Sequence, residues 1–178
     1  MRIIAGAAKG RTLDAPKSGT RPMTGRARES IFSILAQRIR GAHVLDLYAG
    51  SGSLGLEALS RGAADAVFVE RGQRAVAILE RNVDKVGLGG RVRRGDVTAF
   101  LRSETETYDL VFVDPPYADD DTDVHDVLVL IESCLAPQGV IVLHRQERSR
   151  VAVPDFLRTV DERRYGDAVV TMMERQTN

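Results

Sequence analysis

The four residues Asp114-Pro115-Pro116-Tyr117 carry the sharpest chemical signal of this 178-residue chain. They follow the apolar run 110–113, which is typical of a buried strand, so we expect them at the end of that strand. Proline lacks a backbone N–H, and its surroundings offer carbonyl oxygens as acceptors. An acid beside such a carbonyl can hold both N–H protons of an exocyclic amine on a nucleic-acid base. We therefore predict that Asp114, Pro115 and Pro116 orient an amine for methylation and that Tyr117 stacks on the extruded base.

A glycine-rich turn after an earlier apolar strand gives a second signal. Gly50, Gly52 and Gly55 satisfy the Gly-x-Gly-x-x-Gly pattern of dinucleotide sites, which a nicotinamide-dependent oxidoreductase would share. Asp46, at the end of that strand, would repel a pyrophosphate. It would complement the cationic amino and sulfonium groups of S-adenosylmethionine. We predict that Asp46, Ala49, Gly50 and Gly52 bind S-adenosylmethionine, and the oxidoreductase remains the alternative from another enzyme class.

Two more acids follow the next two predicted strands. Glu70 ends the second strand, where a carboxylate can accept hydrogen bonds from both hydroxyls of a ribose. Asp96 follows the third strand, close to where an adenine amino group would lie, although an aspartate there can also cap the next helix. We predict that Glu70 and Asp96 bind the cofactor. The histidines show no metal-ligand spacing, so we predict no metal site.

The charge of the chain is unevenly distributed. Residues 1–40 carry nine basic side chains and two acids, so the remaining 138 residues of this neutral chain carry seven net negative charges. Such a split indicates a segment that binds a polyanion. The predicted RNA-binding residues are Arg2, Lys9, Arg11, Lys17, Arg21, Arg26 and Arg28.

The pattern of strands and helices predicts an α/β fold. Strands and helices alternate from residue 43, which indicates a mostly parallel, Rossmann-like sheet covered on both faces. We expect a C-terminal antiparallel hairpin, a small N-terminal β-hairpin and one helix over 26–40. We divide the chain into a basic arm for RNA recognition, 1–22, and a methyltransferase domain, 23–178. The predicted strands are 44–47, 66–69, 91–93, 110–113 and 140–143, with the hairpin at 157–164 and 168–174, and the other helices are 53–62, 72–87, 97–102 and 124–135.

The single cysteine and the lack of long apolar runs indicate the compartment. Cys134 excludes an intramolecular disulfide, which favours a reducing cytoplasm. Its spacing places it on the buried face of the helix predicted over 124–135. No apolar run is long enough to span a bilayer. We expect a cytoplasmic monomer that does not bind membranes.

Together these motifs resemble the class I methyltransferases whose Pro-Pro-aromatic signature marks amino-group methylation. The fuller similarity is to the RsmD-like guanine-N2 methyltransferases of 16S ribosomal RNA, and it extends over nearly the whole chain. It includes Arg2-Ile3-Ile4-Ala5-Gly6, Lys9-Gly10-Arg11, Arg21-Pro22-Met23-Thr24, Arg28-Glu29-Ser30-Ile31-Phe32 and Leu56-Glu57-Ala58-Leu59-Ser60-Arg61-Gly62-Ala63.

The resemblance implies S-adenosylmethionine as cofactor, Thr24 among the residues that bind it, and a guanine of the small ribosomal subunit as substrate. Met23 stands where similar proteins have threonine. His144 stands where they often have an acid, and we interpret it as structural. A DNA or RNA adenine-N6 methyltransferase is the alternative within the same chemistry, although the short chain leaves little room for a DNA-reading domain.

Overall fold

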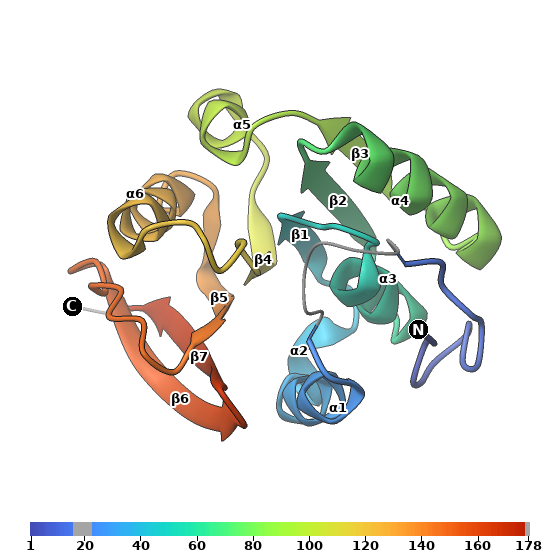
Figure 1. Ribbon diagram of the computed structural model, residues 1–178, viewed down its shortest axis with the longest axis horizontal. Coiled ribbons are helices and arrows are strands. Elements are labelled where there is room, and N and C mark those ends of the chain that lie inside the picture. The colour runs from blue at the N-terminus through green and yellow to red at the C-terminus, as the bar shows by residue number, and fades with distance from the viewer. Residues whose placement is uncertain (16–22, 177–178) are drawn as a thin grey trace.

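The computed structural model describes residues 1–15 and 23–176, and a seven-stranded sheet organises them in the order β3-β2-β1-β4-β5-β7-β6 (Figure 1). Strands β1 to β5 run parallel, and β7 is antiparallel to both β5 and β6. This confirms the predicted mostly parallel α/β sheet with its C-terminal antiparallel hairpin. The strands are β1 (His43–Leu47), β2 (Asp65–Glu70), β3 (Arg91–Arg94), β4 (Tyr108–Val113), β5 (Leu135–Gln146), β6 (Leu157–Tyr165) and β7 (Ala168–Arg175). The helices are α1 (Gly25–Ile34), α2 (Ala36–Ile39), α3 (Ser53–Ser60), α4 (Gln73–Val86), α5 (Val97–Ser103) and α6 (Asp121–Ile131).

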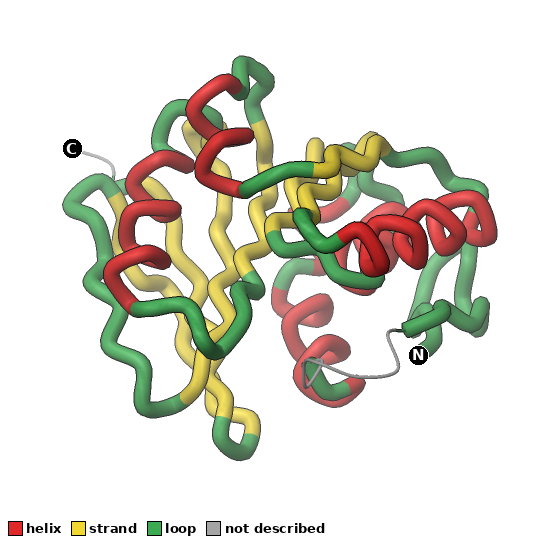
Figure 2. Tube along the Cα trace, turned by 45° about the horizontal axis from the view of Figure 1, so that its top comes forward, coloured by secondary structure: helices red, strands yellow, loops and turns green. Residues whose placement is uncertain are grey.

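Helices cover the sheet on both faces (Figure 2). Successive residues of a strand point to opposite faces, so the central strands divide their side chains between two hydrophobic clusters. Val44 and Phe112 belong to the cluster that contains residues of α1 to α4. Leu45 and Val113 belong to the cluster that contains residues of α5 and α6. The near-continuous apolar runs of these strands are therefore explained by burial on both sides.

The helix predicted over 26–40 is interrupted in the structure. α1 ends at Ile34, and α2 begins at Ala36. At the junction, the backbone N–H of Arg38 bonds to the carbonyl of Leu35, three residues back, so the chain tightens there. Cys134 is also placed differently from its prediction, because α6 ends at Ile131 and Cys134 lies in the turn before β5, still fully buried.

The predicted N-terminal hairpin does not form strands in the described residues. A single antiparallel bridge joins Arg2 and Thr12. Backbone hydrogen bonds from Ile3 N to Arg11 and from Leu13 N to Met1 accompany this bridge, but the pairing stops there. The backbone N–H groups of Ile4 and Ala5 donate to the buried Glu57 carboxylate of α3 at 2.7 and 3.1 Å. The backbone donors therefore find a side chain where a hairpin would offer them a second strand. Figure 1 shows this segment in dark blue beside α3.

Candidate active site

The predicted site residues gather where the strand order of the sheet reverses. β1 lies between β2 and β4, and Leu47 at the end of β1 pairs with Val113 at the end of β4. The connections leave β1 and β4 in opposite directions, which opens a crevice beyond the carboxyl ends of these strands. The glycine turn and Asp114 border that crevice, because they directly follow the two strand ends.

Asp46 lies at the base of the glycine turn and is 1% exposed. Its carboxylate accepts a hydrogen bond of 2.9 Å from the backbone N–H of Gly55 in α3. Burial raises the pKa of Asp46 well above its ordinary value, and the nearby carboxylates of Asp114 and Glu70 raise it further. A cation beside Asp46 would oppose both effects, so this position suits a positively charged ligand.

The glycine turn brings backbone close to the crevice in a conformation that side chains disfavour. Gly50 and Gly52 have φ angles of 56° and 79°, and Tyr48 has a φ of 58° although it is not glycine. A Cβ on Gly52 would lie 2.4 Å from the side chain of Leu79 in α4. Strained backbone of this kind is typical of ligand sites. Tyr48 was not predicted as a site residue, and no motif marks it. Burial raises its pKa to about 12, so its phenol stays neutral.

Glu70 joins the end of β2 to the glycine turn. Its two carboxylate oxygens accept from the backbone N–H groups of Gly50 at 2.9 Å and Gly72 at 2.7 Å. Two fixed donors hold the carboxylate in one orientation, and each oxygen has a further lone pair. Asp96 follows β3, the strand beside β2. The backbone N–H of Gly95 donates to the backbone carbonyl of Glu70, which places Asp96 near the end of β2. Its side chain caps α5 by accepting from Ala99 N at 2.9 Å, so the capping interpretation of Asp96 is confirmed.

Asp114 is held by a residue that we interpreted as structural. His144 on β5 is buried, and its Nδ1 lies 2.7 Å from Oδ1 of Asp114. The ring of Tyr117 lies 6.0 Å from the ring of His144. The register explains the contact, because Val113 pairs with Leu143 and so brings the next residues of β4 and β5 together. The apolar runs 110–113 and 140–143 end directly before Asp114 and His144. Aligning the ends of these two runs as neighbouring parallel strands is the sequence signal that could have found this contact.

The two prolines of the motif differ in their carbonyl partners. The Pro116 carbonyl accepts from Arg145 Nη1 at 3.1 Å and from Asp119 N at 3.0 Å. Our prediction that the proline carbonyls are left for a ligand is therefore wrong for Pro116. Pro115 is buried directly beside Asp114 and remains the proline to which the prediction applies.

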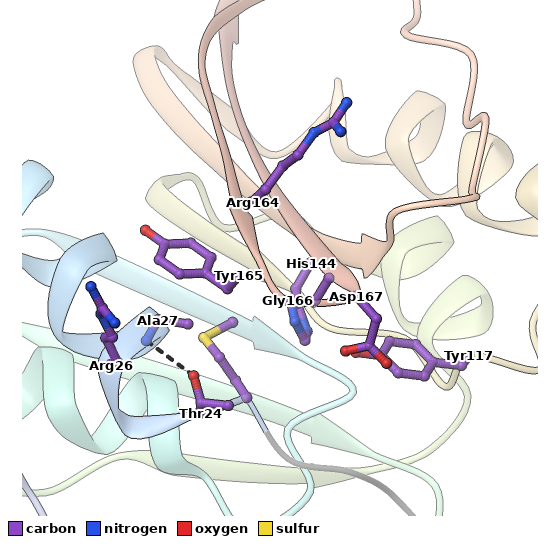
Figure 3. A pocket seen from close by; sticks show the side chains of 11 residues that line it. Thr24, Arg26, Ala27, Tyr117, His144, Arg164, Tyr165, Gly166 and Asp167 are labelled. Carbon is purple, nitrogen blue, oxygen red and sulfur yellow. Dashed lines mark hydrogen bonds between the residues drawn. The ribbon is translucent and has the colours of Figure 1, made fainter.

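A pocket of about 450 Å³ opens beside Asp114, between α1 and the turn that joins β6 to β7. Thr24 lines it and caps α1 by accepting from Ala27 N at 3.2 Å (Figure 3). Arg26 and Arg164 line its walls. The sequence predicted the hairpin but did not mark its turn as part of the site, since only the strand order places β7 against β5. The lining residues are Met23, Thr24, Arg26, Ala27, Tyr117, His144, Arg164, Tyr165, Gly166, Asp167 and Ala168.

The predicted RNA-binding residues fall into different settings. Arg2, Lys9 and Arg26 are exposed. Arg11 is exposed, but it also donates to the carbonyl of Val86 at 3.1 Å, near the end of α4. Arg28 is 3% exposed and donates to the Arg2 carbonyl at 2.6 Å, so the structure contradicts its prediction as an RNA contact. Its guanidinium is used to tie the N-terminal segment to α1. Lys17 and Arg21 lie outside the described residues.

A family model described as "Conserved hypothetical protein 95" matches residues 1–174. The chain belongs to this family. It is 44% identical over 119 residues to "Ribosomal RNA small subunit methyltransferase D" of Escherichia coli K12, which covers 66% of this chain and 60% of that protein. It is 28% identical over 172 residues to the protein of the same description from Haemophilus influenzae, covering 93% and 89%. The predicted family resemblance is confirmed.

The family fold is confirmed by a solved structure. "Putative methyltransferase yhhF from Escherichia coli" superposes with a TM-score of 0.90 at 34% identity, covering 100% of this chain and 99% of that one. This member of the family thus has the Rossmann-like methyltransferase sheet. In residues 1–15 and 23–176 no helix has the length and apolarity needed to cross a membrane. The same residues contain no group of three or more acids, histidines or cysteines placed to hold a metal ion.

Proposed function

We propose that this protein transfers a methyl group from S-adenosylmethionine to the exocyclic N2 amine of a guanine in 16S ribosomal RNA. The observation that carries the proposal is the placement of Asp114. Asp114 is held by His144 at the point where the strand order reverses. The glycine turn with Asp46 follows the neighbouring strand β1, and Tyr117 lines the pocket next to Asp114. The likeness to the two small-subunit methyltransferases supports the RNA substrate and a cytoplasmic location.

The residues of the glycine turn fit the proposed cofactor. Asp46 is a buried carboxylate whose ionised form needs a cation, and S-adenosylmethionine carries a positive amino group and a positive sulfur. Glu70, oriented by Gly50 and Gly72, would accept hydrogen bonds from the ribose hydroxyls. Ala49, Gly50 and Gly52 supply close backbone, and we propose cofactor contacts for Asp96 and Thr24 too. When bound, the cofactor supplies an electrophilic methyl group.

The amine is held by the end of β4. Because the nitrogen lone pair of an exocyclic amine is delocalised into the ring, the amine must be oriented before it can attack. Asp114 accepts one N–H proton, and the Pro115 carbonyl accepts the other, since the Pro116 carbonyl already has two donors. Tyr117 stacks on the base, which contributes roughly 1–3 kcal/mol. Formation of the new N–C bond would be matched by breaking of the bond between the methyl carbon and the cofactor sulfur, which leaves S-adenosylhomocysteine. The nitrogen would then release one proton, and Asp114 is the base placed to receive it.

The test is methylation of ribosomal RNA taken from a strain that lacks this gene. We expect label from methyl-labelled S-adenosylmethionine to enter 16S RNA and nucleoside analysis to return N2-methylguanosine. N6-methyladenosine as product would instead support the adenine alternative. Calorimetric titration separates the other class, because S-adenosylhomocysteine should bind and NAD should not. Our prediction of a monomer is tested by sedimentation of the purified protein.

A further inference from the structure

The pocket beside Asp114 has three walls that come from distant parts of the chain. Met23 and Thr24 directly precede α1 and form one wall, Tyr117 and His144 flank the Asp114 end, and the hairpin turn forms the third wall. β6 and β7 are joined by the two residues Gly166 and Asp167, since Tyr165 pairs directly with Ala168. A volume of about 450 Å³ falls within the range of pockets that bind small ligands.

The hairpin turn is a firm support for the side chain that it carries. Gly166 has a φ of 66° at the first of the two turn positions, which tight hairpins assign to glycine. The backbone carbonyl of Asp167 accepts from Glu147 N at 2.9 Å, which attaches the turn to the chain after β5. The Asp167 carboxylate is thus presented from a fixed backbone. Figure 3 shows it extending toward the end of the pocket where Tyr117 lies.

The polar groups of the pocket suit a nucleotide. Arg26, exposed on the α1 wall, can meet a phosphate beside an extruded base, whereas the guanidinium of Arg164 is paired with the carboxylate of Glu147. Thr24, which is exposed, and the carboxylate of Asp167 add further polar groups to the lining, so a ligand with polar atoms fits the pocket better than an apolar one.

We propose that Asp167 is the residue that selects guanine, by accepting a hydrogen bond from the N1–H of the base bound in this pocket. A base stacked on Tyr117, with its N2 amine at Asp114, presents its Watson–Crick edge to the pocket walls. Guanine has a proton on N1, next to the amine, whereas adenine has a bare N1 acceptor that a carboxylate repels. A carboxylate has about four acceptor positions, so Asp167 can bind the base while keeping contacts within the protein. This inference rests on the proposed guanine-N2 activity.

The experiment uses an RNA oligonucleotide that contains the unmethylated target guanine and a second one with 2-aminopurine in its place. 2-Aminopurine keeps the N2 amine, but it has an acceptor at N1 and lacks the O6 oxygen. The change in the preference between the two RNAs when Asp167 is replaced, and not the wild-type preference alone, therefore tests the proposed contact. We expect the wild-type protein to favour guanine over 2-aminopurine by about tenfold or more in kcat/KM. Asp167→Asn offers an N–H to the bare N1, so it should lose most of this preference. Asp155→Asn, which removes the same charge from an exposed loop, should keep the wild-type ratio.

The possible outcomes separate the two proposals. If Asp167→Asn leaves the ratio of the two kcat/KM values unchanged, the inference is overturned. An equal fall in both values would mean that Asp167 only supports the hairpin or Tyr117. If the wild-type protein methylates neither RNA, the proposed function itself has failed. Thermal unfolding of each variant, with Asp167→Ala included, shows whether the turn has kept its fold.

Discussion

Three carboxylates at the strand ends have different chemistry because each has different partners. Asp46 is buried with one backbone donor, Glu70 is oriented by two backbone donors, and Asp114 is held by the imidazole of His144. Only Asp46 is so deeply buried that its charged form opposes folding. The residue types were readable from the sequence, but their partners follow from which backbone segments meet at the switch point.

Asp46→Asn is expected to stabilise the cofactor-free protein at neutral pH while weakening its binding of S-adenosylmethionine. Burial raises the pKa of Asp46 in the folded state above its value in the unfolded chain. Its contribution is therefore most favourable at pH below about 4 and is lost as the pH rises through the folded-state pKa. Asparagine cannot ionise and keeps an oxygen for Gly55. The gain in unfolding free energy, measured by urea denaturation, should grow from pH 5 to pH 8. A variant less stable than wild type at pH 8 would contradict this account.

His144→Phe is expected to lower kcat by about ten- to hundredfold, because a hydrogen bond to a charged acceptor contributes about 1.5–3 kcal/mol. Phenylalanine keeps a ring against Tyr117 but has no donor for Asp114. His144→Asn should retain much of the wild-type kcat, since the amide nitrogen of asparagine lies as many bonds from Cα as Nδ1 of histidine does. Affinity for S-adenosylhomocysteine should stay within a few-fold in both variants. Equal losses in the two variants would mean that packing, and not the hydrogen bond, is what His144 supplies.

At the scale of elements, the sequence predicted what local pattern controls. The parallel strands were predictable because burial on both faces requires apolar runs, as at 110–113 and 140–143. The N-terminal segment was not, because its pairing ends where the backbone donors of Ile4 and Ala5 bind the side chain of Glu57, more than 50 residues away. The pocket was also hidden, since it needs β7 beside β5 to bring Asp167 and Thr24 to one cavity. Long-range pairing was the missing information in both cases.

Two glycines of the N-terminal segment offer a matched test of its packing on α3. Gly6 and Gly10 have φ angles of 84° and 83°, so alanine at either position costs about 1–2 kcal/mol in backbone strain. A Cβ on Gly6 would lie 1.7 Å from the Ser60 carbonyl oxygen, whereas a Cβ on Gly10 meets nothing within 4 Å. We expect Gly6→Ala to lower the free energy of unfolding clearly more than Gly10→Ala in urea titrations. Equal losses would show that the segment does not pack on α3 as described.

At the scale of the whole molecule, the N-terminal segment is attached to α1, whose first turn lines the pocket. The N-terminal segment belongs to the same hydrophobic cluster as α1, through Ile3 and Leu13. The buried Arg28 binds the backbone of Arg2, which holds the exposed cations of the segment close to α1. Arg26, in the first turn of α1, lines the pocket itself. We propose that these exposed cations bind the RNA backbone, with Arg26 beside the proposed base site.

Removing cations from this surface should therefore change how RNA binding depends on salt. Each phosphate that the protein no longer neutralises should reduce the slope of log K against log salt concentration by about 0.7 to 0.9. We expect Arg2→Gln with Lys9→Gln to reduce the slope by the amount that corresponds to one or two phosphates, measured by fluorescence anisotropy on a 16S RNA fragment. Arg102→Gln, an exposed cation on α5, is the matched control and should leave the slope unchanged. S-adenosylhomocysteine affinity should not change in any of these variants, because none of the three side chains belongs to the glycine turn. Identical slopes for the double variant and the wild type would place the RNA-binding surface elsewhere, and the arginines of the β6–β7 hairpin would be tested next.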